Sequence, residues 1–195
     1  MALMFEYNKE TRTAVVCGVG DKFCEQIVIP STVEYYRKKY DVVAIKEQAF
    51  SECLKLKSVT IPDSVTEIGR WAFHGCSSLT SITIPNRVTE IEGWAFHGCS
   101  SLTSITIPDS VTAIRVWAFY GCSSLTSITI PDSITAIEYC AFEGCSHLKN
   151  VDICNEKGCV DIGYDAFGSD VKVTYLGKDA QPKKKGFFAR LFGKK

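Results

Sequence analysis

The residue types most suited to chemistry in this 195-residue chain are its ten cysteines and three histidines. Five cysteines recur at intervals of 23 residues, at Cys53, Cys76, Cys99, Cys122 and Cys145. A zinc site would instead place its ligands in short pairs such as C-x-x-C, which converge on one ion. One thiol per repeat indicates a column of small buried groups, because free cysteine is among the most buried residue types. We predict that these five cysteines are reduced and structural.

Two further cysteines leave two interpretations open. Cys154 and Cys159 bracket a four-residue segment and could close a small disulfide loop or supply half of a metal site. A metal site would require a second pair of ligands, which the sequence does not offer. The other three cysteines, Cys17, Cys24 and Cys140, are predicted to fill core or near-core positions.

The histidines form part of a second column. His74 and His97 occupy the same repeat position, which is then taken by Tyr120 and Glu143. Two imidazoles ~4.7–4.9 Å apart, one strand spacing, could bind a divalent metal. A metal also needs further ligands and an ordered second shell, so a variable surface column is the favoured interpretation. We predict no metal and no cofactor, and we assign His74, His97 and Tyr120 to a partner-binding surface.

A third column contains Trp71, Trp94 and Trp117 and is interrupted at Cys140. Large aromatic side chains repeated along one face are typical anchors of protein interfaces. Part-buried packing beside the neighbouring phenylalanines is an equal alternative. Positions around this column vary most between otherwise copied units: Arg70, Glu92, Arg115, Glu138 and Tyr139. Variation on a fixed scaffold favours a surface for a protein ligand, with Arg70, Arg115 and Tyr139 as further contact residues.

One predicted face is uniformly hydroxylated, and its members are Ser58, Thr60, Ser81, Thr83, Ser104, Thr106, Ser127 and Thr129. Such a face could hydrogen-bond an extended peptide or a glycan, and a regular threonine array also suggests an ice-binding surface. The ordinary alternative is a solvated sheet face, since threonine favours strands. Catalysis finds no support, because no phosphate-binding loop and no nucleophile–base arrangement is present. We predict that the chain is not an enzyme.

All of these columns arise from four contiguous 23-residue units at residues 53–144, of which CSSLTSITIPNRVTEIEGWAFHG is one. Leu79, Ile82 and Ile84 alternate with hydroxylated residues, as in a half-buried strand that Pro85 ends. The following Ala-Phe pair is expected on a short helical turn, and the glycine after it at a sharp bend. One unit cannot bury its apolar groups alone, so the units must stack.

Degenerate units flank the regular ones, as expected of repeats that cap an exposed core. The sequence predicts a mainly β, right-handed solenoid of about six turns over residues 21–176, with short parallel strands. Nine extra residues in the first unit predict a hairpin or loop at Glu34–Asp41. Residues 1–20 are predicted to cap one end with strands at Phe5–Tyr7 and Thr13–Cys17, and Val171–Tyr175 the other end.

The repeated motif L-x-x-I-x-I-P-x-x-[VI]-T-x-I-x-x-x-A-F-x-G-C resembles the BspA-like leucine-rich repeats, also called the Treponema pallidum type. The resemblance is close over residues 54–145 and looser over residues 21–167. It implies a leucine-rich-repeat solenoid and a non-enzymatic function. It also implies a surface protein used for adhesion to host or matrix proteins.

The formal net charge of zero conceals a basic tail. Residues 181–195 carry six lysines and arginines and no acid, so the remaining chain has a formal charge of −6. An acidic body does not suit nucleic-acid binding. Residues 177–195 are predicted to be a linker and an amphipathic tail. Phe187, Phe188, Leu191 and Phe192 gather on one side of a helix there, and Arg190 and Lys194 on another.

This tail is predicted to bind an anionic membrane, with a partner's groove or a disordered end as the alternatives. The start of the chain has no secretory signal pattern, which predicts a cytoplasmic protein, held at the membrane periphery by the tail. We also predict a monomer. The alternative is a cell-surface adhesin whose signal peptide was removed. On either interpretation, the sequence predicts a protein-interaction module. A thiol- or metal-dependent sensor or enzyme is the remaining, less favoured alternative.

The full chain is expected to co-sediment with anionic vesicles at low salt. It should be released as the Debye length falls to ~8–10 Å and below. A chain ending at Gln181 should stay in solution, as should one carrying Phe188→Glu with Leu191→Glu. If the full chain ignores anionic vesicles at low salt, the membrane prediction is wrong.

Overall fold

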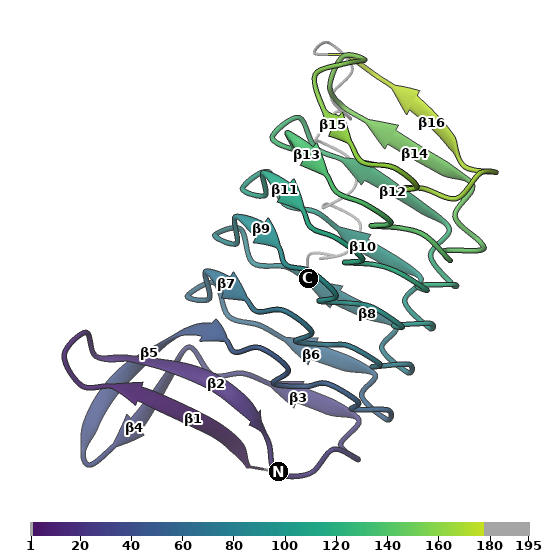
Figure 1. Cartoon of the computed structure of the whole chain (residues 1–195). Coiled ribbons are helices and arrows are strands. Elements are labelled where there is room, and N and C mark those ends of the chain that lie inside the picture. The colour runs from purple at the N-terminus through teal and green to yellow at the C-terminus, as the bar shows by residue number, and fades with distance from the viewer. Residues whose placement is uncertain (1, 178–195) are drawn as a thin grey trace, which may run out of the picture.

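The computed structural model describes residues 2–177, which form a solenoid of stacked coils (Figure 1). Short strands lie in two rows along the stack, joined by turns (Figure 1). The first row contains β3 (Gln26–Val28), β6 (Ser58–Thr60), β8 (Ser81–Thr83), β10 (Ser104–Thr106), β12 (Ser127–Ile130), β14 (Asn150–Ile153) and β16 (Lys172–Tyr175). The second row contains β7 (Glu67–Ile68), β9 (Glu90–Ile91), β11 (Ala113–Ile114), β13 (Ala136–Ile137) and β15 (Asp161–Ile162). The predicted solenoid of about six turns is confirmed.

Strand register follows the sequence period. On the first row β8 and β10 pair in parallel, with Ile82 opposite Ile105. On the second row β11 and β13 pair in parallel, with Ala113 opposite Ala136. Because each partner lies 23 residues away, side chains of equivalent positions stack directly on one another. Columns read from the sequence are therefore columns in space.

The N-terminal end carries a different sheet. β1 (Leu3–Asn8) and β2 (Thr13–Val19) form an antiparallel pair, and β2 pairs in parallel with β5 (Lys38–Ile45). β4 (Thr32–Tyr35) folds back on β5 as an antiparallel hairpin, so the predicted hairpin or loop at Glu34–Asp41 is a hairpin. This sheet projects beyond the body of the solenoid (Figure 1). It places four paired strands at the end of the stack.

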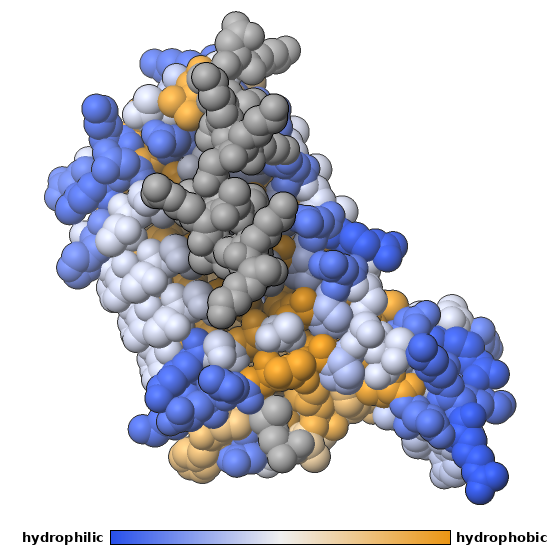
Figure 2. Space-filling model, turned by 180° about the vertical axis from the view of Figure 1, so that it is seen from behind, coloured by the Kyte–Doolittle hydropathy of each residue, from blue (hydrophilic) through white to orange (hydrophobic). Residues whose placement is uncertain are grey.

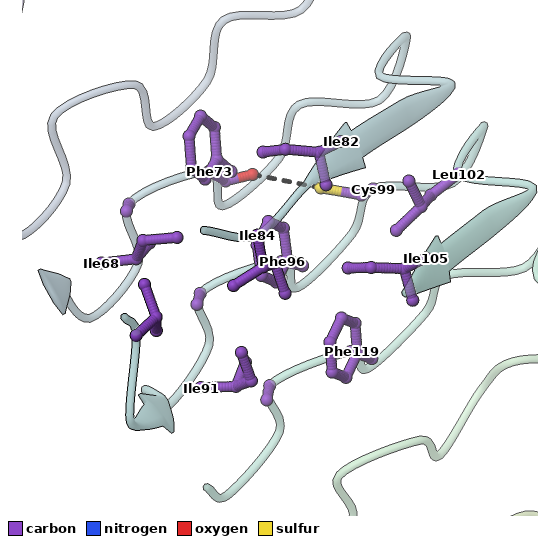
Figure 3. Close-up of a cluster of buried hydrophobic side chains, with 14 of the residues drawn as sticks. Ile68, Phe73, Ile82, Ile84, Ile91, Phe96, Cys99, Leu102, Ile105 and Phe119 are labelled. Atoms are coloured by element: carbon purple, nitrogen blue, oxygen red, sulfur yellow. Dashed lines mark hydrogen bonds between the residues drawn. The ribbon is translucent and has the colours of Figure 1, made fainter. Parts of the chain in front are cut away.

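Leucine, isoleucine and phenylalanine from successive coils fill the interior (Figure 3). The phenylalanines stack face to face along the axis, with ring centroids 5.0 to 5.5 Å apart, and are Phe50, Phe73, Phe96, Phe119, Phe142 and Phe167. Phe96 is fully buried between two such neighbours. On β8, Ile82 is buried while Ser81 and Thr83 are exposed, as the alternating pattern predicts. The core is thus one continuous column rather than a separate core in each coil.

The short helical turn expected at each Ala-Phe pair is wrong, since the residues that the structure describes include no helix. The reason is visible at Phe96, whose backbone N–H donates to the carbonyl of Ala118 in the next coil at 2.8 Å. Trp94, two residues earlier, has a φ of +57°, which a right-handed helix cannot contain. Bonding between coils therefore replaces bonding within a helix. Accordingly, no helix within residues 2–177 is long and apolar enough to cross a membrane.

The five repeat cysteines are buried, as predicted. The thiol of Cys99 donates to the carbonyl oxygen of Phe73 at 3.3 Å (Figure 3). The thiols of Cys76, Cys122 and Cys145 donate in the same way to Phe50, Phe96 and Phe119. Each of these four thiols therefore ties one coil to a carbonyl of the previous coil. Cys154 is buried and Cys159 is exposed, and both are free thiols.

Candidate binding surface

The tryptophan column forms the start of a continuous stack of rings, here called the aromatic ladder: Trp71, Trp94, Trp117, Tyr139 and Tyr164. The three tryptophans are half-buried, and neighbouring rings lie 5.0 and 4.9 Å apart. Tyr139 meets Trp117 edge-on at 5.8 Å and stacks with Tyr164 at 6.3 Å. Each tryptophan ring thus packs on its neighbours and also reaches the surface, and its contact with a partner stays a prediction.

The backbone under the tryptophans is left-handed. Trp71, Trp94 and Trp117 have φ values of +54°, +57° and +54°. This conformation costs a non-glycine residue roughly 1–2 kcal/mol, and asparagine, aspartate or glycine would adopt it more readily. The same position of the other coils holds Gln48 before the tryptophans, and Cys140 and then Asp165 after them, all with positive φ. Tryptophan is therefore a costly choice for this turn, and stacking between the rings offsets part of that cost.

A second column runs beside the ladder and contains His74, His97 and Tyr120. Ring centroids are 5.0 Å apart for the two histidines and 4.8 Å for His97 and Tyr120. His74 Nδ1 lies 3.1 Å from a carboxylate oxygen of Glu52. His97 Nδ1 is buried, without a hydrogen-bond partner among the described residues. Burial, and then the nearby His74, lower the pKa of His97, so its ring is neutral at pH 7.

A shallow, open hollow of roughly 340 Å³ lies between the ladder and the second column. Its lining residues are Trp94, Trp117, Tyr139, His97, Tyr120 and Glu143. Five aromatic rings and one carboxylate thus face the same space. Within residues 2–177, no group of three or more histidine, cysteine, aspartate or glutamate side chains could hold a metal ion.

The two predicted arginines occupy different environments. The guanidinium of Arg70 is exposed and lies over the rings of Trp71 and Trp94, at 4.8 and 5.1 Å from their centroids. Arg115 instead bridges two carboxylates, donating to Glu90 and Glu138 at 2.7 Å each. This pairing raises the pKa of Arg115. Arg115 therefore ties three coils together, and its side chain is less available to a partner than that of Arg70.

A second surface region lies at the other end of the molecule. Figure 2 shows an apolar patch low on the rear face, beside the projecting N-terminal sheet. Most of the exposed large apolar side chains also belong to the first coils: Met4, Phe23, Val28, Tyr36 and Leu54. This region lacks the regular spacing of the ladder, and nothing in it selects one kind of ligand.

Sequence reasoning identified every member of the ladder except Tyr164. Tyr164 lies 25 residues after Tyr139 rather than 23, because the last unit carries an insertion. The sequence signal that could have found it is the Ala166-Phe167 pair, which lies 25 residues after Ala141-Phe142, and the pairing of β13 with β15 has the same offset. The predicted tail residues, Phe187, Phe188, Arg190, Leu191, Phe192 and Lys194, lie outside the described part of the chain.

The stacked coils and their motif define a class of protein, the leucine-rich-repeat solenoids. Residues 43–174 match the model of the BspA type leucine rich repeat region in six copies. The chain belongs to this family, and the predicted resemblance is confirmed. No curated protein matches the chain.

Solved structures agree with this assignment. The Treponema pallidum leucine-rich repeat protein is 28% identical with a TM-score of 0.71, covering 83% of each chain. A leucine-rich repeat protein of Bacteroides ovatus is 29% identical with a TM-score of 0.69, over 88% of this chain and 53% of that one. A leucine rich cell surface protein of Faecalibacterium prausnitzii is 29% identical with a TM-score of 0.69, over 89% and 53%. This chain spans about half the length of the last two proteins.

Proposed function

We propose that the chain is a non-catalytic protein-binding module whose partner contacts the aromatic ladder and the second column. The observation that carries this proposal is the unbroken run of half-buried and exposed rings across five coils. Aromatic side chains dominate the energetics of protein interfaces because they bury much area at a low cost in conformational entropy. Rings stacked on a rigid solenoid are also ordered before binding, which lowers that cost further.

Two observations favour different cellular locations for the protein. The 29% sequence identity with a leucine rich cell surface protein of Faecalibacterium prausnitzii favours adhesion at the cell exterior. The cysteines of residues 2–177 are all free thiols, and this favours a reducing compartment, because disulfides accumulate in secreted proteins. We propose the cytoplasmic side as the first to test, with the tail as a membrane contact and surface adhesion as the second candidate.

A photo-crosslinking amino acid in place of Tyr120 should capture a partner protein from an extract of the source cells. The same amino acid in place of Thr106, on the strand face, should not. Trp117→Asn should remove the capture, since losing an interface anchor costs ~2 kcal/mol or more. Asparagine suits the left-handed backbone, so this variant should stay folded.

Circular dichroism of the Trp117→Asn variant supplies the folding control. Capture from position 106 that survives Trp117→Asn would place the site on the strand face instead. Capture from position 120 that is unchanged in folded Trp117→Asn would remove the ladder from the interface.

A further inference from the structure

The side chains that line the hollow between the ladder and the second column favour a ligand of positive charge. The face of an aromatic ring carries the negative end of its quadrupole and attracts cations. Five rings border this hollow, from Trp94, Trp117, Tyr139, His97 and Tyr120. His97 adds no positive charge at pH 7, because its burial disfavours the imidazolium. The rings therefore favour a cation over an anion, and the ring of Trp94 already has the guanidinium of Arg70 at 5.1 Å from its centroid.

A carboxylate completes the hollow. Glu143 is half-buried at its border, and no lysine, arginine or histidine within residues 2–177 forms an ion pair with it. Its contact there is with the thiol of Cys140, which is a weak donor and leaves the charge uncompensated. Glu138 is a second carboxylate in this region, but it is already paired with Arg115. Glu143 is thus the carboxylate that lines the hollow itself, and a partner's cation can pair with it there.

One cation of the chain itself already lies on the ladder. One step along, Arg70 lays its guanidinium over Trp71 and Trp94 at 4.8 and 5.1 Å. A guanidinium is planar and weakly hydrated, so it stacks on rings and loses little hydration in a shallow site. An ammonium group keeps its hydration more strongly and gains less in such a hollow.

We propose that the hollow binds an arginine side chain of a partner protein. The guanidinium stacks over Trp117 and its neighbouring rings while its N–H groups donate to the carboxylate of Glu143. This assignment rests on the proposed function and names the chemistry that the partner must present. It extends to the next step of the ladder the contact that Arg70 already makes with Trp71 and Trp94.

Tryptophan fluorescence can test the assignment directly, because all three tryptophans of the chain belong to the ladder. The probe is the peptide acetyl-Gly-Arg-Gly-amide, titrated into the full chain. Its control is the same peptide with citrulline, which keeps the planar shape and lacks the charge. The arginine peptide should change the emission in a saturable manner. The citrulline peptide should produce no saturable change over the same concentrations.

Glu143→Gln should lower the affinity for the arginine peptide about tenfold, which is the loss expected for one charge-assisted hydrogen bond. Glu67→Gln is the matched control, since Glu67 is exposed on β7 and borders no part of the hollow. Equal binding of the two peptides to the native chain would overturn the proposal, as would unchanged affinity in a folded Glu143→Gln. If position 120 still captures a partner while neither peptide binds, the arginine assignment is wrong and the ladder remains the interface.

Discussion

Replacing Phe96 by alanine is expected to lower the free energy of unfolding by about 3–5 kcal/mol. Phe96 is fully buried and stacks on Phe73 and Phe119 at 5.5 and 5.3 Å. Its removal leaves a cavity in the middle of the phenylalanine column, and the flanking coils cannot close it without breaking their own register. Denaturant unfolding followed by circular dichroism measures the loss.

Phe23→Ala is the matched control for this prediction. The Phe23 side chain is 79% exposed, so its removal should change the unfolding free energy by about 0.5 kcal/mol or less. A similar loss for both variants would mean that the phenylalanine column contributes little beyond surface packing. A loss confined to Phe96→Ala would show that burial in the phenylalanine column, and not loss of a phenylalanine as such, stabilises the stacked coils.

The repeat cysteines are expected to resist a thiol reagent in the native protein. Burial raises the pKa of Cys99 to about 12 and that of Cys53 to about 11. The reagent attacks the thiolate, and at pH 8 a thiol of pKa about 12 is ionised in only about one molecule in ten thousand. Labelling of these residues should therefore accelerate by orders of magnitude when denaturant is added, whereas exposed Cys159 should react at once.

A companion variant tests whether the thiol itself matters. Cys99→Ser should destabilise the chain by ~1–3 kcal/mol, the cost of burying a poorly paired hydroxyl. The Phe73 carbonyl lies 3.3 Å from the sulfur, and the shorter C–O bond of serine would place the hydroxyl farther from it. Rapid labelling of the repeat cysteines in native protein would contradict the buried column.

The candidate site illustrates where sequence reasoning stops. Trp71, Trp94 and Trp117 could be placed on one column from spacing alone, because register between coils follows the period. Their left-handed backbone could not, since φ depends on how the turn closes onto the next coil. Cys140 occupies the tryptophan position of the next coil, yet the ladder continues through Tyr139, one residue earlier. This depends on the direction in which the Tyr139 side chain points. Spacing says nothing about that direction.

Sequence by itself determined the repeat, its 23-residue register, the buried thiol column and the place of the inserted residues in the first unit. It did so because stacked coils turn a one-dimensional period into spatial neighbours, so that each position meets its own copies. Only the tertiary structure decided that the Ala-Phe turn is not helical. Only it decided that Arg115 is held by Glu90 and Glu138 while Arg70 lies over the rings. These outcomes depend on contacts between different positions of neighbouring coils, where backbone bonding and side-chain direction compete and no period applies.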